Sequence, residues 1–123
     1  MAPFCGAMGA SMARAKRMNV GPNLDETITR FADYITKKQQ RLEDGTFCRP
    51  RPFKRSIWLD DAYMSVPLLA QVGKITGDRK YFDDAVTQIK GFHKHLFVPQ
   101  SKLFTHATHV AIEDNQPKRP AAR

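Results

Sequence analysis

The sequence predicts an all-α protein. In two segments the apolar residues recur at helical spacing, a third segment is apolar on nearly every side, and no stretch shows convincing strand alternation. The chain has 123 residues, enough for one domain, and its 41% hydrophobic composition is typical of a globular protein. We expect an irregular tail at 1–20, a helical domain over 21–112 and a disordered basic tail at 113–123.

The first helix is predicted at 24–41. Asn23 can cap its N-terminus, and Glu26 follows three residues later, where it can reach back as in a capping box. One apolar stripe has spacings of four, three and four: Leu24, Ile28, Phe31 and Ile35. The following Asp44-Gly45 dipeptide is a turn signal and separates this helix from the next segment.

The second helix is predicted at 59–76 and begins beside the only tryptophan, Trp58. Between residues 62 and 70 the only polar side chains are Ser65 and the hydroxyl of Tyr63, and a helix that is apolar all round is normally buried. Pro67 lies within it and favours a kink, because proline cannot donate the helical hydrogen bond.

The third helix is predicted at 79–97, because Gly77 can end the second helix and Asp78 can cap the next. Its apolar residues make a single face: Phe82, Ala85, Val86, Ile89, Phe92 and Leu96. A connection this short joins the second and third helices as an antiparallel hairpin.

The loop at 46–55 concentrates positive charge in a chain whose net charge is +8. It contains four cations and two interleaved aromatic residues: Arg49, Arg51, Lys54, Arg55, Phe47 and Phe53. Aromatic residues that stack on bases, with cations that follow phosphates, would suit a nucleic acid. A solvated basic loop is the favoured interpretation, and a loop that attracts a carboxylate-bearing substrate is a third.

Other classes of site have little support. His93 and His95 are two residues apart on a helix and point in different directions, so no metal and no cofactor is expected. Cys5 and Cys48 lack metal-like spacing and suit free thiols in a reducing compartment. No apolar run is long enough for a membrane span, and no normal secretory signal is visible, so we expect a cytoplasmic protein without a membrane partner.

Asp60 and Asp61 lie at the start of the second helix. Each either caps the helix or acts as a catalytic acid. A carboxylate in the first turn is stabilised as the anion, which lowers its pKa, and local sequence favours this interpretation. A general acid needs a raised pKa, which burial against Trp58 or a second nearby carboxylate can supply.

A set of motifs follows one another in a fixed register: Trp58-Leu-Asp60-Asp61-Ala-Tyr-Met64, Pro67-Leu-Leu-Ala70, Thr76-Gly-Asp78, Tyr81-Phe-Asp-Asp-Ala85, Gln88 and Leu103-Phe-Thr-His106-Ala107. In this order they resemble the unsaturated rhamnogalacturonyl and glucuronyl hydrolases of glycoside hydrolase families 105 and 88. The resemblance extends over about residues 24–110. The Trp-x-Asp and Phe-x-His-Ala elements, in register with the helical hairpin, make the match specific.

The resemblance implies an (α/α)6 barrel, in which six inner helices are ringed by six outer ones. The second helix would be an inner helix and the third an outer one. By position Asp60 matches the catalytic acid, and Trp58 and His106 match residues that line the sugar pocket. The implied partner is a pectin-derived oligosaccharide with a 4,5-unsaturated uronic acid at its non-reducing end, hydrolysed by hydration of the vinyl ether.

The chain also departs from this family. Three helices make about a quarter to a third of such a barrel, and nothing acidic precedes Asp25 to match the family's other conserved Asp. We therefore expect a fragment that is inactive alone and self-associates through exposed apolar surface. The alternatives are a small basic module that binds nucleic acid, the less favoured partner, or another protein. A helical-repeat module would need a second copy of the hairpin, and the sequence contains none.

Overall fold

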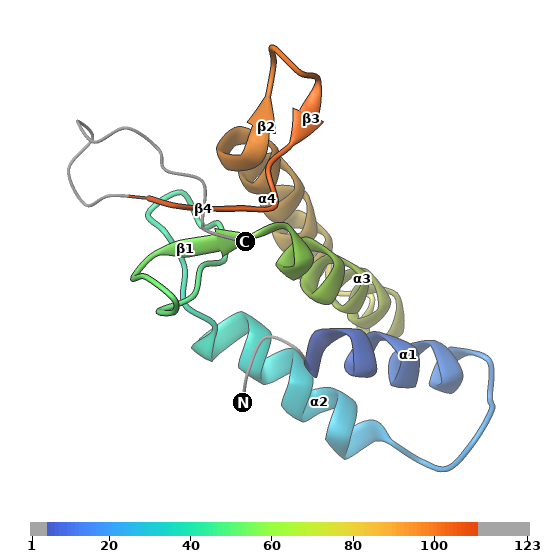
Figure 1. The fold of residues 1–123 in the computed structure, drawn as a ribbon. Helices are drawn as coiled ribbons and strands as arrows, with labels where there is room; N and C mark the ends of the chain where they lie inside the picture. The colour runs from blue at the N-terminus through green and yellow to red at the C-terminus, as the bar shows by residue number, and fades with distance from the viewer. Residues whose placement is uncertain (1–4, 111–123) are drawn as a thin grey trace. The chain divides into compact units, whose positions relative to one another are not determined.

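The structure is a computed structural model that describes residues 5–110 (Figure 1). The basic tail predicted at 113–123 lies outside the described residues. The chain divides into two compact units, one of Met1–Gln39 with Tyr63–Val86 and one of Gln40–Ala62 with Thr87–Arg123. Two helices, α3 (Leu59–Thr76) and α4 (Arg79–Leu96), contribute residues to both units.

Residues 5–17 of the first unit are helical, so the irregular tail expected at 1–20 was wrong over that range. Helix α1 (Cys5–Arg17) lies beside α2 (Asp25–Asp33) in Figure 1. It packs through small residues. A Cβ added to Gly6 would lie 1.7 Å from the carbonyl oxygen of Met64, and one added to Gly9 would lie 3.1 Å from Leu68 Cδ1. A contact made by backbone approach leaves no stripe of large apolar residues, so periodicity did not reveal it.

Gly6→Ala should therefore detach α1 from α3. The added methyl group meets a backbone carbonyl, which cannot rotate away, so α1 must shift as a whole. We expect a loss of about 1–3 kcal/mol in the free energy of unfolding, measured in urea. Ser11→Ala, at an exposed position of the same helix, is the control and should change stability little. Equal stability of the two variants would contradict this packing.

The helix predicted at 24–41 is present but is not one regular helix. It consists of α2 followed by a π-helical segment, η1 (Tyr34–Lys38), and the chain turns extended at Gln39. Asn23 Oδ1 accepts a hydrogen bond of 2.9 Å from the Asp25 amide, but the N-cap of α2 is Leu24, which makes no side-chain cap hydrogen bond, so the cap predicted at Asn23 was one residue too early. The buried side chains include Ile28, Ala32 and Ile35, which follow the helical spacing of the sequence.

Helices α3 and α4 confirm the predictions at 59–76 and 79–97 to within a residue. Gly77 leaves α3 with a φ of +68°, and Asp78 Oδ1 accepts the Lys80 amide at 3.0 Å as the cap of α4. The chain folds back there, since a Cβ added to Gly73 would lie 2.9 Å from Phe82 Cζ. None of the described helices is long and apolar enough to cross a membrane.

The apolar face of α4 is only partly covered. Ala85, Phe92 and Leu96 are buried, whereas three stripe residues stay exposed: Phe82, Val86 and Ile89. Tyr63 on α3 is 70% exposed. Exposed apolar surface of this kind favours association, and self-association of the chain stays a prediction.

The second unit contains short strands, which the sequence did not predict. β1 (Ser56–Trp58) pairs antiparallel with β4 (Ala107–His109), and β2 (Phe97–Val98) pairs antiparallel with β3 (Leu103–Phe104). Each strand has two or three residues, too few to show alternation in a sequence. The partners β1 and β4 are also distant along the chain, so only the tertiary structure pairs them (Figure 1).

A buried glutamine fixes the turn that precedes the basic loop. Gln88 is fully buried on α4, its Oε1 accepts the Phe47 amide at 2.8 Å, and its Nε2 donates to the Gly45 carbonyl at 2.8 Å. The helix is also close to this turn at Gly91, where an added Cβ would lie 2.0 Å from Thr46 Oγ1. The segment 45–47 is therefore held against α4 by the two hydrogen bonds of Gln88.

Gln88→Leu should destabilise the fold by about 1–3 kcal/mol, because it keeps the side-chain size but leaves the buried Phe47 amide without its partner and removes one of the two donors to the Gly45 carbonyl. Thermal unfolding followed by circular dichroism measures the loss. Gln100→Leu, at an exposed position, is the matched control and should leave the midpoint nearly unchanged. A Gln88→Leu protein as stable as the control would show that these two bonds contribute nothing.

Candidate functional site

The candidate site lies in the second unit, where β1 runs directly into α3. Pairing of β1 with β4 sets Trp58 opposite Ala107, so that the preceding residue, His106, lies next to the start of the helix. The Leu59 amide donates a hydrogen bond of 2.8 Å to the His106 carbonyl. Two segments nearly fifty residues apart are thus joined by backbone hydrogen bonds beside the first turn of α3.

The three predicted site residues come together at this junction. The rings of Trp58 and His106 meet edge to face with centroids 5.1 Å apart. His106 Nε2 lies 3.5 Å from Asp60 Oδ2, and both side chains are about half exposed, 53% for His106 and 52% for Asp60. A carboxyl group that ligands can reach therefore stands next to an imidazole and an indole.

Asp61 behaves differently from its neighbour. Its side chain is 3% exposed and receives two hydrogen bonds from Arg49, one from Nε to Oδ2 at 2.7 Å and one from Nη2 to Oδ1. Burial raises the pKa of the Asp61 carboxyl above its usual range, against the opposing effect of the Arg49 guanidinium. The observed role of Asp61 is therefore to pair with a cation.

Arg49 is the functional candidate that sequence reasoning missed. Besides binding Asp61, its guanidinium carbon lies 5.1 Å from the centre of the Trp58 ring, within the range of a cation–π contact. The same indole has its Nε1 buried, with no hydrogen-bond partner in the described part of the chain. In the sequence Arg49 is one of four cations in a proline-containing loop, and no local pattern separates it from the other three.

The remaining candidates lie elsewhere in the unit. His93 stacks on Phe97 with centroids 4.7 Å apart, and His109 contacts Phe53 at 5.4 Å. Across residues 5–110 no three His, Cys, Asp or Glu side chains are grouped so that they could hold a metal ion. Burial raises the pKa of the Cys48 thiol to about 11, so it is a protonated thiol at neutral pH and a poor nucleophile.

The geometry suits proton donation from a carboxyl group to a ligand bound against an aromatic surface. The family model of Glycosyl Hydrolase Family 88 matches residues 7–121. The chain belongs to glycosyl hydrolase family 88.

Solved structures support the fold. The chain is similar to a possible member of glycoside hydrolase family 105 from Salmonella enterica subsp. enterica serovar Paratyphi A str. ATCC 9150, with a TM-score of 0.71 and 19% identity over 82% of this chain. A possible family 105 member from Klebsiella pneumoniae subsp. pneumoniae MGH 78578 gives 0.68 and 18% over 87%. The family 105 glycoside hydrolase of C. acetobutylicum ATCC 824 gives 0.60 and 26% over 68%. No curated protein sequence matches the chain.

The matches cover only part of each relative. The chain spans 28%, 29% and 23% of the length of these three structures. Family 105 structures are (α/α)6 barrels, so the described helices correspond to a part of such a barrel, as the sequence predicted.

Proposed function

We propose that the chain carries the proton-donating part of a hydrolase for oligosaccharides that end in a 4,5-unsaturated uronic acid. The observation that supports it is the arrangement of Asp60, Trp58 and His106 around an accessible carboxyl group, with the adjacent Asp61 engaged by Arg49. Only Asp60 of the two carboxylates is exposed to a ligand.

The reaction needs one protonated carboxyl and one water molecule. Asp60 gives a proton to C4 of the vinyl ether, water adds to the resulting cation at C5, and the proton that this water loses returns to the Asp60 carboxylate. The hemiketal then opens, which converts C1 into a hemiacetal that releases the neighbouring sugar. Trp58 supplies an apolar face for the sugar ring, and His106 holds the Asp60 side chain in place through its Nε2.

A chimera tests this proposal. A family 105 barrel in which the corresponding segment is replaced by residues 40–110 of this chain should hydrolyse an unsaturated digalacturonate but not its saturated counterpart. Turnover removes the C4=C5 bond and is followed by the fall in ultraviolet absorbance. The 123-residue chain alone should show no turnover, since it spans less than a third of its structural relatives. Equal hydrolysis of saturated and unsaturated substrates would contradict the proposed chemistry.

A further inference from the structure

The two ends of the basic loop before β1 are joined by backbone hydrogen bonds. Arg49 and Ser56 exchange both backbone hydrogen bonds, at 2.7 and 3.0 Å, and close the loop between them. The buried Ser56 hydroxyl donates to the Phe53 carbonyl at 2.5 Å. Pro50 and Pro52 further restrict the backbone. The loop is therefore ordered before a ligand binds, and binding loses little conformational entropy of the loop.

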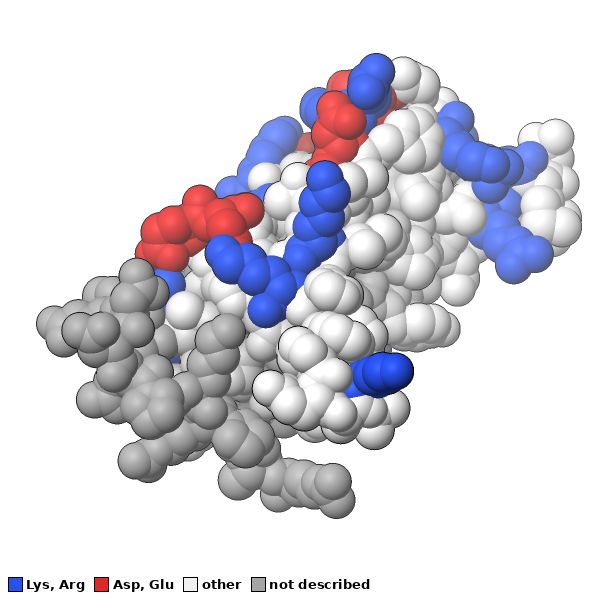
Figure 2. All heavy atoms as spheres, turned by 90° about the horizontal axis from the view of Figure 1, so that it is seen from above, with Lys and Arg blue, Asp and Glu red and all other residues white. Residues whose placement is uncertain are grey.

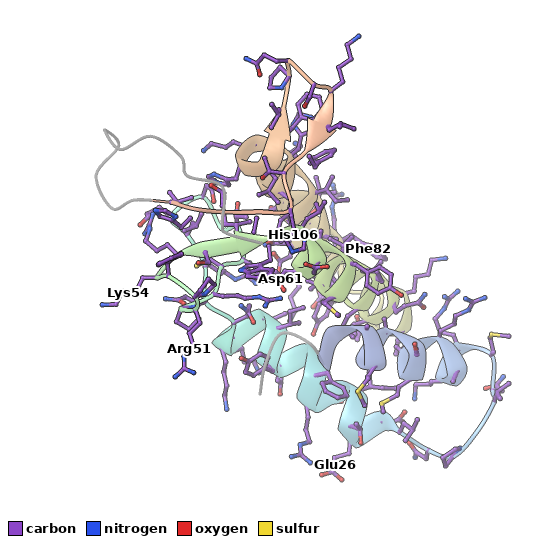
Figure 3. All side chains as sticks on the ribbon, viewed as in Figure 1. Glu26, Arg51, Lys54, Asp61, Phe82 and His106 are labelled. Atoms are coloured by element: carbon purple, nitrogen blue, oxygen red, sulfur yellow. The ribbon has the colours of Figure 1, made fainter. Side chains whose placement is uncertain are left out.

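Two of the four cations of this loop are bound to carboxylates, and the other two are exposed. Arg49 is bound to Asp61. Arg55 donates to the Val110 carbonyl at 3.0 Å and to both oxygens of Glu43, at 2.5 and 2.7 Å, and its guanidinium lowers the pKa of Glu43 to about 2. Arg51 and Lys54 are exposed and make no ion pair within the described part, and Figure 3 shows both pointing away from the ribbon.

An exposed aromatic residue, Phe53, lies between these two cations in the sequence. The Phe53 side chain is 53% exposed, and one side of its ring is supported by His109, with centroids 5.4 Å apart. Arg51, Phe53 and Lys54, here called the loop tip, therefore present an apolar face flanked by two positive charges. Nothing in the proposed chemistry at Asp60 uses these three side chains.

The loop tip and the candidate site are connected by one short ladder. In it Ser56 pairs with His109 and Trp58 pairs with Ala107. His109, which supports the loop tip, and His106, which contacts Asp60, are three residues apart on the same segment, about 10 Å along an extended strand. A short oligosaccharide can extend over this distance.

We propose that the loop tip binds the acidic sugars of the substrate beyond the unsaturated residue. This inference rests on the proposed function and specifies its substrate as a polyuronate chain. The two cations would pair with carboxylates, and the Phe53 ring would stack on the C–H face of a sugar. A nucleic acid is disfavoured, because two of the four loop cations are already engaged. On the face drawn in Figure 2 the basic side chains lie in separate groups, and several of them lie beside acidic ones.

The test is titration of the isotope-labelled full chain with saturated tetragalacturonate, followed by NMR. Because this probe lacks the C4=C5 bond, it reports the loop tip rather than recognition of the unsaturated sugar. Amide shifts should centre on Arg51, Phe53, Lys54 and His109, and cellotetraose, the neutral control, should cause none. Arg51→Ala with Lys54→Ala should weaken binding about tenfold, and Phe53→Ala about fivefold.

Control variants separate the proposal from its alternatives. Lys74→Ala with Lys90→Ala removes the same charge from exposed positions elsewhere and should change the affinity less than about twofold. An equal loss of affinity in this control would overturn the proposal. So would a single-stranded oligonucleotide that binds more tightly than tetragalacturonate and loses its binding when Arg51 and Lys54 are changed. Tetragalacturonate binding needs no C4=C5 bond, whereas turnover by the chimera does, so failure of the loop tip and failure of the hydrolase chemistry give different results.

Discussion

Replacing Asp60 with asparagine in the chimeric barrel should lower kcat by about 10²–10⁴-fold, the usual contribution of a positioned general acid. Asparagine keeps the size and the hydrogen-bonding shape of the side chain but cannot give up a proton to C4. The substrate still meets Trp58 and His106, so KM should change little, and the loss should appear in kcat and kcat/KM alike. The measurement is the initial rate of absorbance loss over a range of unsaturated digalacturonate concentrations.

Asp61→Asn is the matched control for this measurement, because the two carboxylates are adjacent and differ only in direction and burial. The folded fraction of the Asp61→Asn chimera should retain turnover. The assignment of Asp60 as the proton donor would be wrong if Asp60→Asn kept wild-type kcat, or if Asp61→Asn abolished turnover in protein shown to be folded.

Asp61→Asn should instead destabilise the chain by about 3–5 kcal/mol, the range seen when one partner of a buried ion pair is removed. A carboxylate that merely stabilised the first turn of a helix would cost about 0.3–1 kcal/mol. The larger value follows from the structure, since the substitution leaves the Arg49 guanidinium buried without its counter-charge. Urea unfolding of the full chain, followed by circular dichroism, measures the difference.

A double variant identifies the cause of this loss. Arg49→Met with Asp61→Leu removes both charges and should recover most of the stability lost in Asp61→Asn, because burying an ion pair carries a desolvation cost that apolar side chains avoid. The same variant removes the cation over Trp58, so the indole fluorescence of this only tryptophan should change. A loss of less than 1 kcal/mol in Asp61→Asn would show that the pair does not hold the first turn of α3.

The sequence alone determined the helical hairpin and the family. The bounds of α3 and α4 follow from an apolar segment, an apolar stripe and the Gly77-Asp78 pair, all of them local features. The Trp-x-Asp and Phe-x-His-Ala motifs, read by their resemblance, indicated a glycoside hydrolase of families 88 and 105. Local signals of this kind can be recognised in a sequence because they depend only on neighbouring residues.

The tertiary structure decided what depends on contacts between distant segments. Helix α1 packs through glycines against α3, and the β1–β4 ladder joins residues about fifty positions apart, so neither produces a periodic pattern. The different environments of Asp60, which is exposed, and Asp61, which is buried, also depend on a distant segment. Neighbours on a helix differ in direction by about 100°, but which of them faces a buried cation depends on where the 49–55 loop folds. Asp61 is the buried carboxylate because Arg49, twelve residues earlier in the sequence, binds it.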